Sequence, residues 1–114
     1  MQQNTSFLSR AIELCWRAMI DLRTLRQRRD EILRLARRYR AEDVRVFGSV
    51  IRGDNTKASD VDVLIKTWPG CSLLDLGGLL EDLQDMLNCR VDLVIEDGLK
   101  PRLRDRVLHE AVPL

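Results

Sequence analysis

The chain has 114 residues, of which 45% are hydrophobic and 32% are charged, and its formal net charge is +1. These values are typical of a globular domain and exclude a wholly disordered chain. No apolar run reaches the ~18 residues of a membrane span, and the first residues lack the pattern of a secretion signal. The three cysteines, Cys15, Cys71 and Cys89, form no CxxC pair. We therefore expect neither a zinc site nor a disulfide framework, and we expect a reducing cytoplasm as the compartment.

Charge is distributed unevenly along the chain. Residues 1–58 contain 13 Lys and Arg against 7 Asp and Glu, whereas residues 59–114 contain 6 against 11. A solvated arginine-rich helix would explain this asymmetry. Contact between the basic half and an anion, such as a nucleotide, an RNA or an acidic partner, would explain it equally well.

Apolar residues recur with the period of an α-helix from about residue 9 to residue 40. The repeat is carried by two sets: Ile12, Cys15, Trp16 and Met19, then Ile32, Leu35, Ala36 and Tyr39. Between them, residues 23–29 (RTLRQRR) offer little apolar surface, so we expect a break there. We predict an N-terminal helical extension over residues 1–30 and one main domain over residues 31–114. Met19 is a second candidate for the first residue.

Three short strands are predicted in the main domain, over residues 44–47 (VRVF), 61–65 (VDVLI) and 90–95 (RVDLVI). A leucine-rich helix follows Ser72, whose spacing to Asp75 is that of a capping box. Pro101 suits the first turn of a last helix. The predicted class is α/β (α+β), a small mixed sheet of about three or more strands with helices covering one face.

Acidic residues interrupt two of these strands. Asp60 and Asp62 are two residues apart, so their side chains point to the same side while the valines between and after them point to the core. Two like charges this close repel each other unless a cation lies between them. Asp92 repeats the pattern in the third strand, and it would join them if the two strands are neighbours. Such an oxygen cluster suits Mg²⁺ or Mn²⁺, and two such ions would assist a phosphoryl or nucleotidyl transfer.

The segment before these aspartates has the features of an anion site. Gly48 and Ser49 follow a strand directly and precede residues that can begin a short helix. A glycine lets backbone amides approach an anion, and the serine adds a hydroxyl donor. Arg52 and Lys57 are within reach of the same anion. Together with the aspartates, this pattern predicts a triphosphate and metal site.

Each feature alone has a simpler explanation. A Gly-Ser pair is more often a turn, and an Asp-x-Asp on a surface strand is more often a solvated face. Asp92 would serve as a guard against aggregation if its strand lies at the sheet edge, and Arg52 would pair with Asp54. Their joint occurrence, in this order and on these elements, favours the metal and nucleotide site.

The pattern Gly48-Ser49, ten residues, then Asp60-x-Asp62 resembles the signature of the DNA polymerase β-like nucleotidyltransferase superfamily. Residues 47–65 resemble its minimal members, the MNT antitoxins of HEPN ribonuclease toxins, and the similarity extends from about Glu31 to Leu114. The resemblance implies a palm-like sheet that binds Mg²⁺ and ATP. It also implies transfer of AMP to a tyrosine of a HEPN-type toxin, which blocks RNA cleavage, in a hetero-oligomer of the two proteins.

The resemblance further implies a role for each site residue. Asp60 and Asp62 would hold the metal ions, and Asp92 would be the third ligand and the general base. The β- and γ-phosphates would lie against Gly48 and Ser49. Arg52 would assist them, although this last correspondence is the weaker one.

Two other functions remain open from the sequence. The chain could be an antitoxin that neutralises its toxin by binding and occlusion, using the basic residues 23–40 and the apolar C-terminus. It could also be a nucleotidyltransferase that acts on RNA or on a small molecule. The few aromatic residues show no stacking pattern of a single-strand binder, so direct binding of nucleic acid is not expected.

Overall fold

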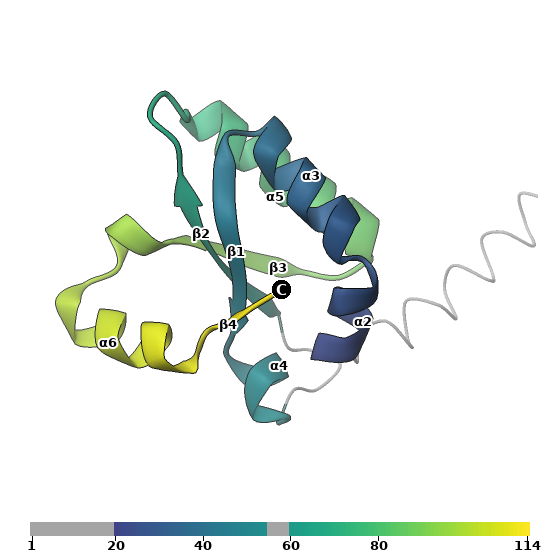
Figure 1. Cartoon of the computed structure of the whole chain (residues 1–114), viewed down its shortest axis with the longest axis vertical. Coiled ribbons are helices and arrows are strands. Elements are labelled where there is room, and N and C mark those ends of the chain that lie inside the picture. The colour runs from purple at the N-terminus through teal and green to yellow at the C-terminus, as the bar shows by residue number, and fades with distance from the viewer. Residues whose placement is uncertain (1–19, 55–59) are drawn as a thin grey trace, which may run out of the picture.

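The computed structural model describes residues 20–54 and 60–114. Over these ranges the elements are α2 (Leu22–Gln27), α3 (Arg29–Arg38), β1 (Ala41–Phe47), α4 (Ser49–Arg52), β2 (Val61–Thr67), α5 (Leu73–Leu87), β3 (Val91–Ile95), the 3₁₀ turn η1 (Glu96–Gly98), α6 (Pro101–Glu110) and β4 (Val112–Pro113). The strands form one mixed sheet in the order β3-β2-β1-β4 (Figure 1). β2 pairs antiparallel with β1 and parallel with β3. None of the described helices is long and apolar enough to cross a membrane.

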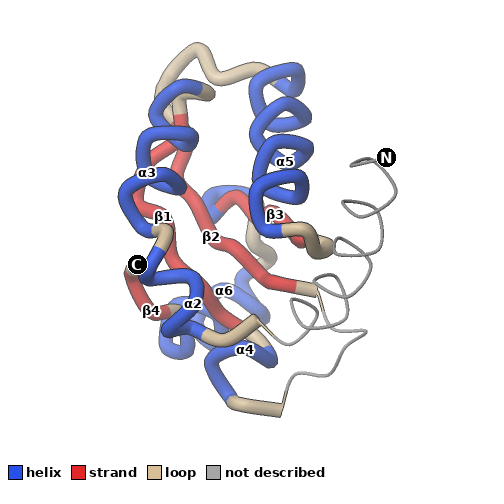
Figure 2. The backbone as a smooth tube through the Cα atoms, turned by 90° about the vertical axis from the view of Figure 1, so that its right-hand side faces the viewer, coloured by secondary structure: helices blue, strands red, loops and turns tan. Residues whose placement is uncertain are grey.

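The main core lies between the sheet and the pair α3 and α5, which run side by side (Figure 2). The strands contribute every second residue to it, because successive side chains of a strand point to opposite faces. The buried aliphatic residues of this interface are Ile32, Ala36, Val44, Val46, Val61, Val63, Ile65, Leu79, Leu83, Leu87 and Val91. Ile20 and Leu25 belong to the same buried cluster. The predicted alternation in the second and third strands is thereby confirmed.

The start of α5 and its packing on α3 also follow the sequence prediction. The Ser72 hydroxyl accepts a hydrogen bond from the Asp75 amide (3.2 Å), and the Asp75 carboxylate accepts one from the Ser72 amide (3.0 Å). This reciprocal pair is the predicted capping box. Further along α5, a Cβ on Gly78 would lie 2.6 Å from Cε1 of Tyr39. A glycine is therefore needed for the two helices to approach this closely.

The predicted break in the N-terminal helical region is confirmed, because Arg28 separates the end of α2 from the start of α3. The Arg28 guanidinium donates to the Met86 carbonyl (2.6 Å), which ties this corner to the end of α5. The first part of the predicted helix, up to residue 19, lies outside the described residues. The division of the chain at residue 30 stays a prediction.

The structure places one helix on the face that the sequence left uncovered. We predicted helices on one face of the sheet, but α6 lies on the opposite face from α3 and α5 (Figure 1). The physical reason is that this second face is partly apolar, with Leu64 fully buried on it. An ion cluster anchors the start of α6. The buried Glu96 carboxylate pairs with Arg45 of β1 (2.6 Å) and with Arg104 of α6 (3.5 Å).

Candidate active site

A cavity of about 310 Å³ lies between this second face of the sheet and α6. Its lining comes from β1, α4, β2, β3 and α6 with the adjoining turns: Phe47, Gly48, Arg52, Asp62, Asp92, Val94, Leu99, Leu103, Arg106, Val107 and Glu110. Four of the predicted site residues are thus brought together in one hollow: Gly48, Arg52, Asp62 and Asp92. Ser49 begins α4 beside them. Lys57 lies outside the described residues.

The two strand carboxylates are placed by the pairing of β2 with β3. In this parallel pair Asp62 is the direct register partner of Asp92, so the predicted neighbourhood of the two strands is confirmed. Asp60 lies immediately before β2. Burial, together with the charges of Asp92 and Asp60, raises the pKa of Asp62 from 3.8 to about 6. The Asp62 carboxylate is therefore within electrostatic reach of both other predicted ligands.

A divalent cation suits this arrangement on chemical grounds. Within residues 20–54 and 60–114, no three His, Cys, Asp or Glu side chains already converge into a metal-binding group. The like-charge repulsion that raises the pKa of Asp62 is what a cation would relieve, and carboxylate oxygens are the donors that Mg²⁺ and Mn²⁺ prefer. The assignment of Asp60, Asp62 and Asp92 as metal ligands remains a prediction.

Gly48 is required by its backbone conformation and by its closeness to Asp62. Its φ is 79° and its ψ is −150°, a combination that only glycine adopts readily. A Cβ at this position would also collide with Oδ2 of Asp62. The cause is the register of β1 with β2, which places Phe47 opposite Asp62 and so brings the following turn onto the carboxylate.

The backbone amide of Gly48 already holds an anion, the carboxylate of Glu110. The Gly48 N–H donates to Oε1 of Glu110 (2.9 Å), and the Arg52 guanidinium donates to the same oxygen (2.9 Å). Arg52 also donates to Asp54 (3.3 Å), which is the simpler pairing considered from the sequence. Sequence reasoning missed Glu110. The only signal was an acidic residue at the end of the last helix, and nothing in its spacing connects it to Gly48.

The other wall of the cavity is apolar. It is formed by Val94 of β3, by Leu99 and by Leu103 and Val107 of α6. Leu103 remains 47% exposed, which is unusual for a large aliphatic side chain. The lining therefore combines carboxylates and cations with apolar side chains, a combination typical of sites that bind organic ligands.

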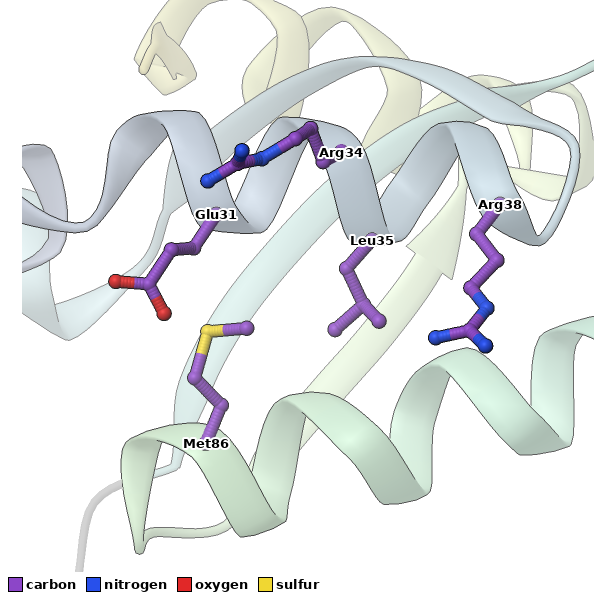
Figure 3. A pocket seen from close by; sticks show the side chains of 5 residues that line it. All are labelled: Glu31, Arg34, Leu35, Arg38 and Met86. Carbon is purple, nitrogen blue, oxygen red and sulfur yellow. The ribbon is translucent and has the colours of Figure 1, made fainter.

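A second hollow, of about 250 Å³, lies between α3 and α5 and is lined by Glu31, Arg34, Leu35, Arg38 and Met86 (Figure 3). Its acidic residue pairs with a neighbouring arginine, Arg28 (2.9 Å). It holds no pair of carboxylates and no glycine turn. The cavity beneath α6 is therefore the candidate for phosphate and metal chemistry.

Comparison with known proteins shows the family to which the chain belongs. The family model for the nucleotidyltransferase domain matches residues 25–114. The chain is 40% identical over 78 residues to the protein adenylyltransferase MntA of Thermococcus cleftensis, a match that covers 68% of this chain and 79% of the relative. It is also 40% identical over 67 residues to a proposed protein adenylyltransferase of Methanocaldococcus jannaschii, covering 59% of this chain and 72% of that one.

Comparison with solved structures supports the predicted fold. A proposed minimal nucleotidyltransferase, 50% identical in sequence, superposes with a TM-score of 0.75 over 83% of this chain and 97% of its own. A toxin–antitoxin complex crystallised with AMP-PNP superposes with a TM-score of 0.64 at 22% identity, over 75% of this chain and 70% of its own, and shares the fold. The predicted fold class and enzyme class are confirmed. The chain belongs to the nucleotidyltransferase domain family, and minimal nucleotidyltransferases are among its relatives.

Proposed function

We propose that this protein is an antitoxin that transfers AMP from Mg²⁺-bound ATP to a tyrosine of a partner ribonuclease toxin of the HEPN type. The observation that carries the proposal is the cavity in which Asp62 and Asp92 face Gly48 and Arg52. Relatives at 40% identity have names of protein adenylyltransferases. Structures with the same fold include a toxin–antitoxin complex with AMP-PNP and an MNT antitoxin bound to a tri-AMPylated HEPN toxin.

Each site residue then has a role in the reaction. The amide of Gly48, the hydroxyl of Ser49 and the guanidinium of Arg52 orient the β- and γ-phosphates. Asp92 accepts the proton of the incoming hydroxyl, whose oxygen attacks the α-phosphorus. The bond from that phosphorus to the bridging oxygen breaks, and pyrophosphate leaves. Mg²⁺ held by Asp60, Asp62 and Asp92 would supply charge neutralisation at the triphosphate.

The apolar wall of the cavity favours an aromatic acceptor. Val94, Leu99 and Leu103 line the same cavity as Asp92, and Val94 points to the same side of β3 as Asp92 because the two residues are two apart in the strand. An aromatic ring packed on this wall would bring its hydroxyl toward the Asp92 carboxylate, whereas a ribose or phosphate group would gain little from apolar contact. This observation supports a tyrosine acceptor over an RNA end.

The acceptor would be brought by a partner protein. The side of the cavity formed by α6 includes the half-exposed Leu103, so an acceptor can enter from outside the domain. A toxin subunit that covers this opening would complete the site and exclude water from it. The active species in this proposal is a hetero-oligomer, and we place it in the cytoplasm, where ATP is available.

The test is the intact mass of the product of the neighbouring gene, as the candidate toxin, co-expressed either with this protein or with its Asp60→Ala/Asp62→Ala variant. We expect mass increases of one or more adenylates only with the unchanged protein. Circular dichroism of the variant controls for its fold. A toxin that stays unmodified but is still bound and neutralised by both forms would replace the enzymatic proposal with occlusion.

A further inference from the structure

A single carboxylate oxygen binds the two N–H donors of the cavity that come from Gly48 and Arg52. Oε1 of Glu110 accepts hydrogen bonds from the Gly48 amide and from the Arg52 guanidinium, both at 2.9 Å. These two donors are the groups that the proposed function assigns to the nucleotide phosphates. A phosphate oxygen would use the same donors with similar geometry, because both groups present anionic oxygens to N–H donors.

The position of Glu110 adds to like-charge repulsion in the cavity. Its carboxylate shares the cavity with Asp62 and Asp92. A carboxylate is stable in this place because the two donors compensate it. When those donors bind a phosphate instead, Glu110 loses its hydrogen-bond partners and is repelled by both the aspartates and the phosphate.

The backbone around Glu110 is held independently of this contact. The Ala111 amide donates to the Val107 carbonyl (2.8 Å), which completes the last turn of α6. The next two residues form β4, in which Val112 is the register partner of Val46 in β1. Displacement of the carboxylate therefore requires only a rotation of the Glu110 side chain, and α6 and β4 stay in place.

We infer that Glu110 is an internal placeholder for the nucleotide phosphates: it binds the Gly48 amide and Arg52 in the free protein and is displaced when ATP binds. This inference rests on the proposed function. The contact keeps the glycine turn and the arginine oriented for an anion before ATP arrives. It also lowers the affinity for ATP, because the ligand must compete with a covalently tethered carboxylate. After transfer, its return competes with rebinding of pyrophosphate.

The experiment is a calorimetric titration of Mg²⁺-ATP into the full-length chain and three variants. Glu110→Gln keeps the shape of the side chain without its charge, and Glu110→Ala removes both the charge and the hydrogen bonds. Asp105→Asn removes one charge from an exposed position of the same helix and is the matched control. We expect the dissociation constant for ATP to fall roughly five- to tenfold in both Glu110 variants, and to change less than about twofold in the control.

The Gly48 amide provides a second measurement that reports the contact itself. Its ¹⁵N–¹H resonance should shift in the unchanged protein when ATP binds, and in the free protein when Glu110 becomes alanine. If the unchanged protein binds ATP and the Glu110 variants bind it no more tightly, the placeholder is refuted and the proposed function stands. If no form of the protein binds ATP, both proposals fail together. Thermal melts verify that every variant is folded.

Discussion

Asp62 and Asp92 are direct register partners across the parallel strands β2 and β3, on the face of the sheet covered by α6. In such a pair the two side chains point the same way and stand next to each other. A fold that needed only stability would not place two carboxylates here, because burial and the charge of Asp92 both raise the cost of ionising Asp62. Their juxtaposition is therefore the structural relationship on which the proposed site most depends.

The first prediction follows from the pKa of Asp62, which burial and the charges of Asp92 and Asp60 raise from 3.8 to about 6. The folded state holds this proton more tightly than the unfolded state, so its stabilising contribution is complete below about pH 4 and is lost as the pH rises through 6. At pH 8 the ionised carboxylate destabilises the fold. Asp62→Asn should therefore raise the free energy of unfolding at pH 8 by about 1 kcal/mol, after allowance for solvent screening.

Urea denaturation at pH 8 and at pH 4.5, without divalent cations, measures this effect. The gain of Asp62→Asn over the unchanged protein should be full at pH 8 and reduced to about a third of that value at pH 4.5. Asp105→Asn, an exposed change of the same charge, should show no such difference between the two pH values. An equal gain at both pH values would mean that repulsion at Asp62 is not its cause.

The second prediction concerns the glycine turn. In Gly48→Ala the new Cβ meets Oδ2 of Asp62 and the backbone keeps a φ of 79°. We expect a loss of about 2–3 kcal/mol in the free energy of unfolding and the loss of AMP transfer. Gly53→Ala is the matched control, because Gly53 has the same φ, and among the described residues beyond its chain neighbours no atom lies within 4 Å of its Cβ position. It should cost about 1 kcal/mol and leave AMP transfer intact.

Chemical denaturation and the toxin mass assay separate these two variants. If both lose the same stability, the collision with Asp62 contributes nothing and the backbone conformation explains the whole effect. If Gly48→Ala transfers AMP at the unchanged rate, the close approach of this turn to Asp62 is not needed for the reaction.

The third prediction concerns the buried ion cluster that anchors α6. The Glu96 carboxylate is 2.6 Å from the Arg45 guanidinium, and both side chains are largely buried. Glu96→Gln would leave the arginine charge without its main partner, although Asp43 remains 3.5 Å from it. We expect a loss of about 2–3 kcal/mol in the free energy of unfolding. Asp97→Asn, an exposed change in the same turn, should have an effect below about 0.5 kcal/mol.

Denaturation at pH 7 measures both variants. The Arg45 guanidinium lowers the pKa of Glu96, so the contribution of this pair is present above the ordinary pKa of 4.5 and is lost as the pH falls below it. The two proteins should therefore differ less in acid. A Glu96→Gln protein as stable as the unchanged one at pH 7 would show that the pair does not anchor α6.

Local patterns in the sequence predicted most of the fold. The alternation in β2 and β3 was readable because every second residue enters the core, and the Ser72–Asp75 capping box depends on residues only three apart. The early part of β1 was not predicted. Asp43 has a φ of 54° and forms a bulge, so the alternation that marks a strand is interrupted there. The two-residue strand β4, which includes Pro113, is too short to give a pattern.

The candidate site likewise contains residues that the sequence predicted and one that it did not. The sequence predicted Asp62, Asp92 and Gly48, because each lies in a local strand or turn pattern with known chemical use. It did not predict Glu110, because the contact of Glu110 with Gly48 joins residues 62 positions apart and depends on how α6 folds back over the sheet. The sequence predicted α6 through Pro101 but gave no indication of the face it covers.

The last prediction tests the apolar wall as the acceptor site. Leu103 lines the cavity with Asp92 but is 47% exposed, so it contributes little to the stability of the domain. Leu103→Ser should reduce the rate of toxin modification roughly tenfold, because the aromatic ring of the acceptor loses apolar contact, and should leave ATP affinity within about twofold. Leu74→Ser is the control, since Leu74 is 88% exposed and lies outside the cavity. Single-turnover mass spectrometry measures the rate, and calorimetry measures the affinity. Equal loss of ATP binding and of transfer in Leu103→Ser would assign this wall to the nucleotide and not to the acceptor.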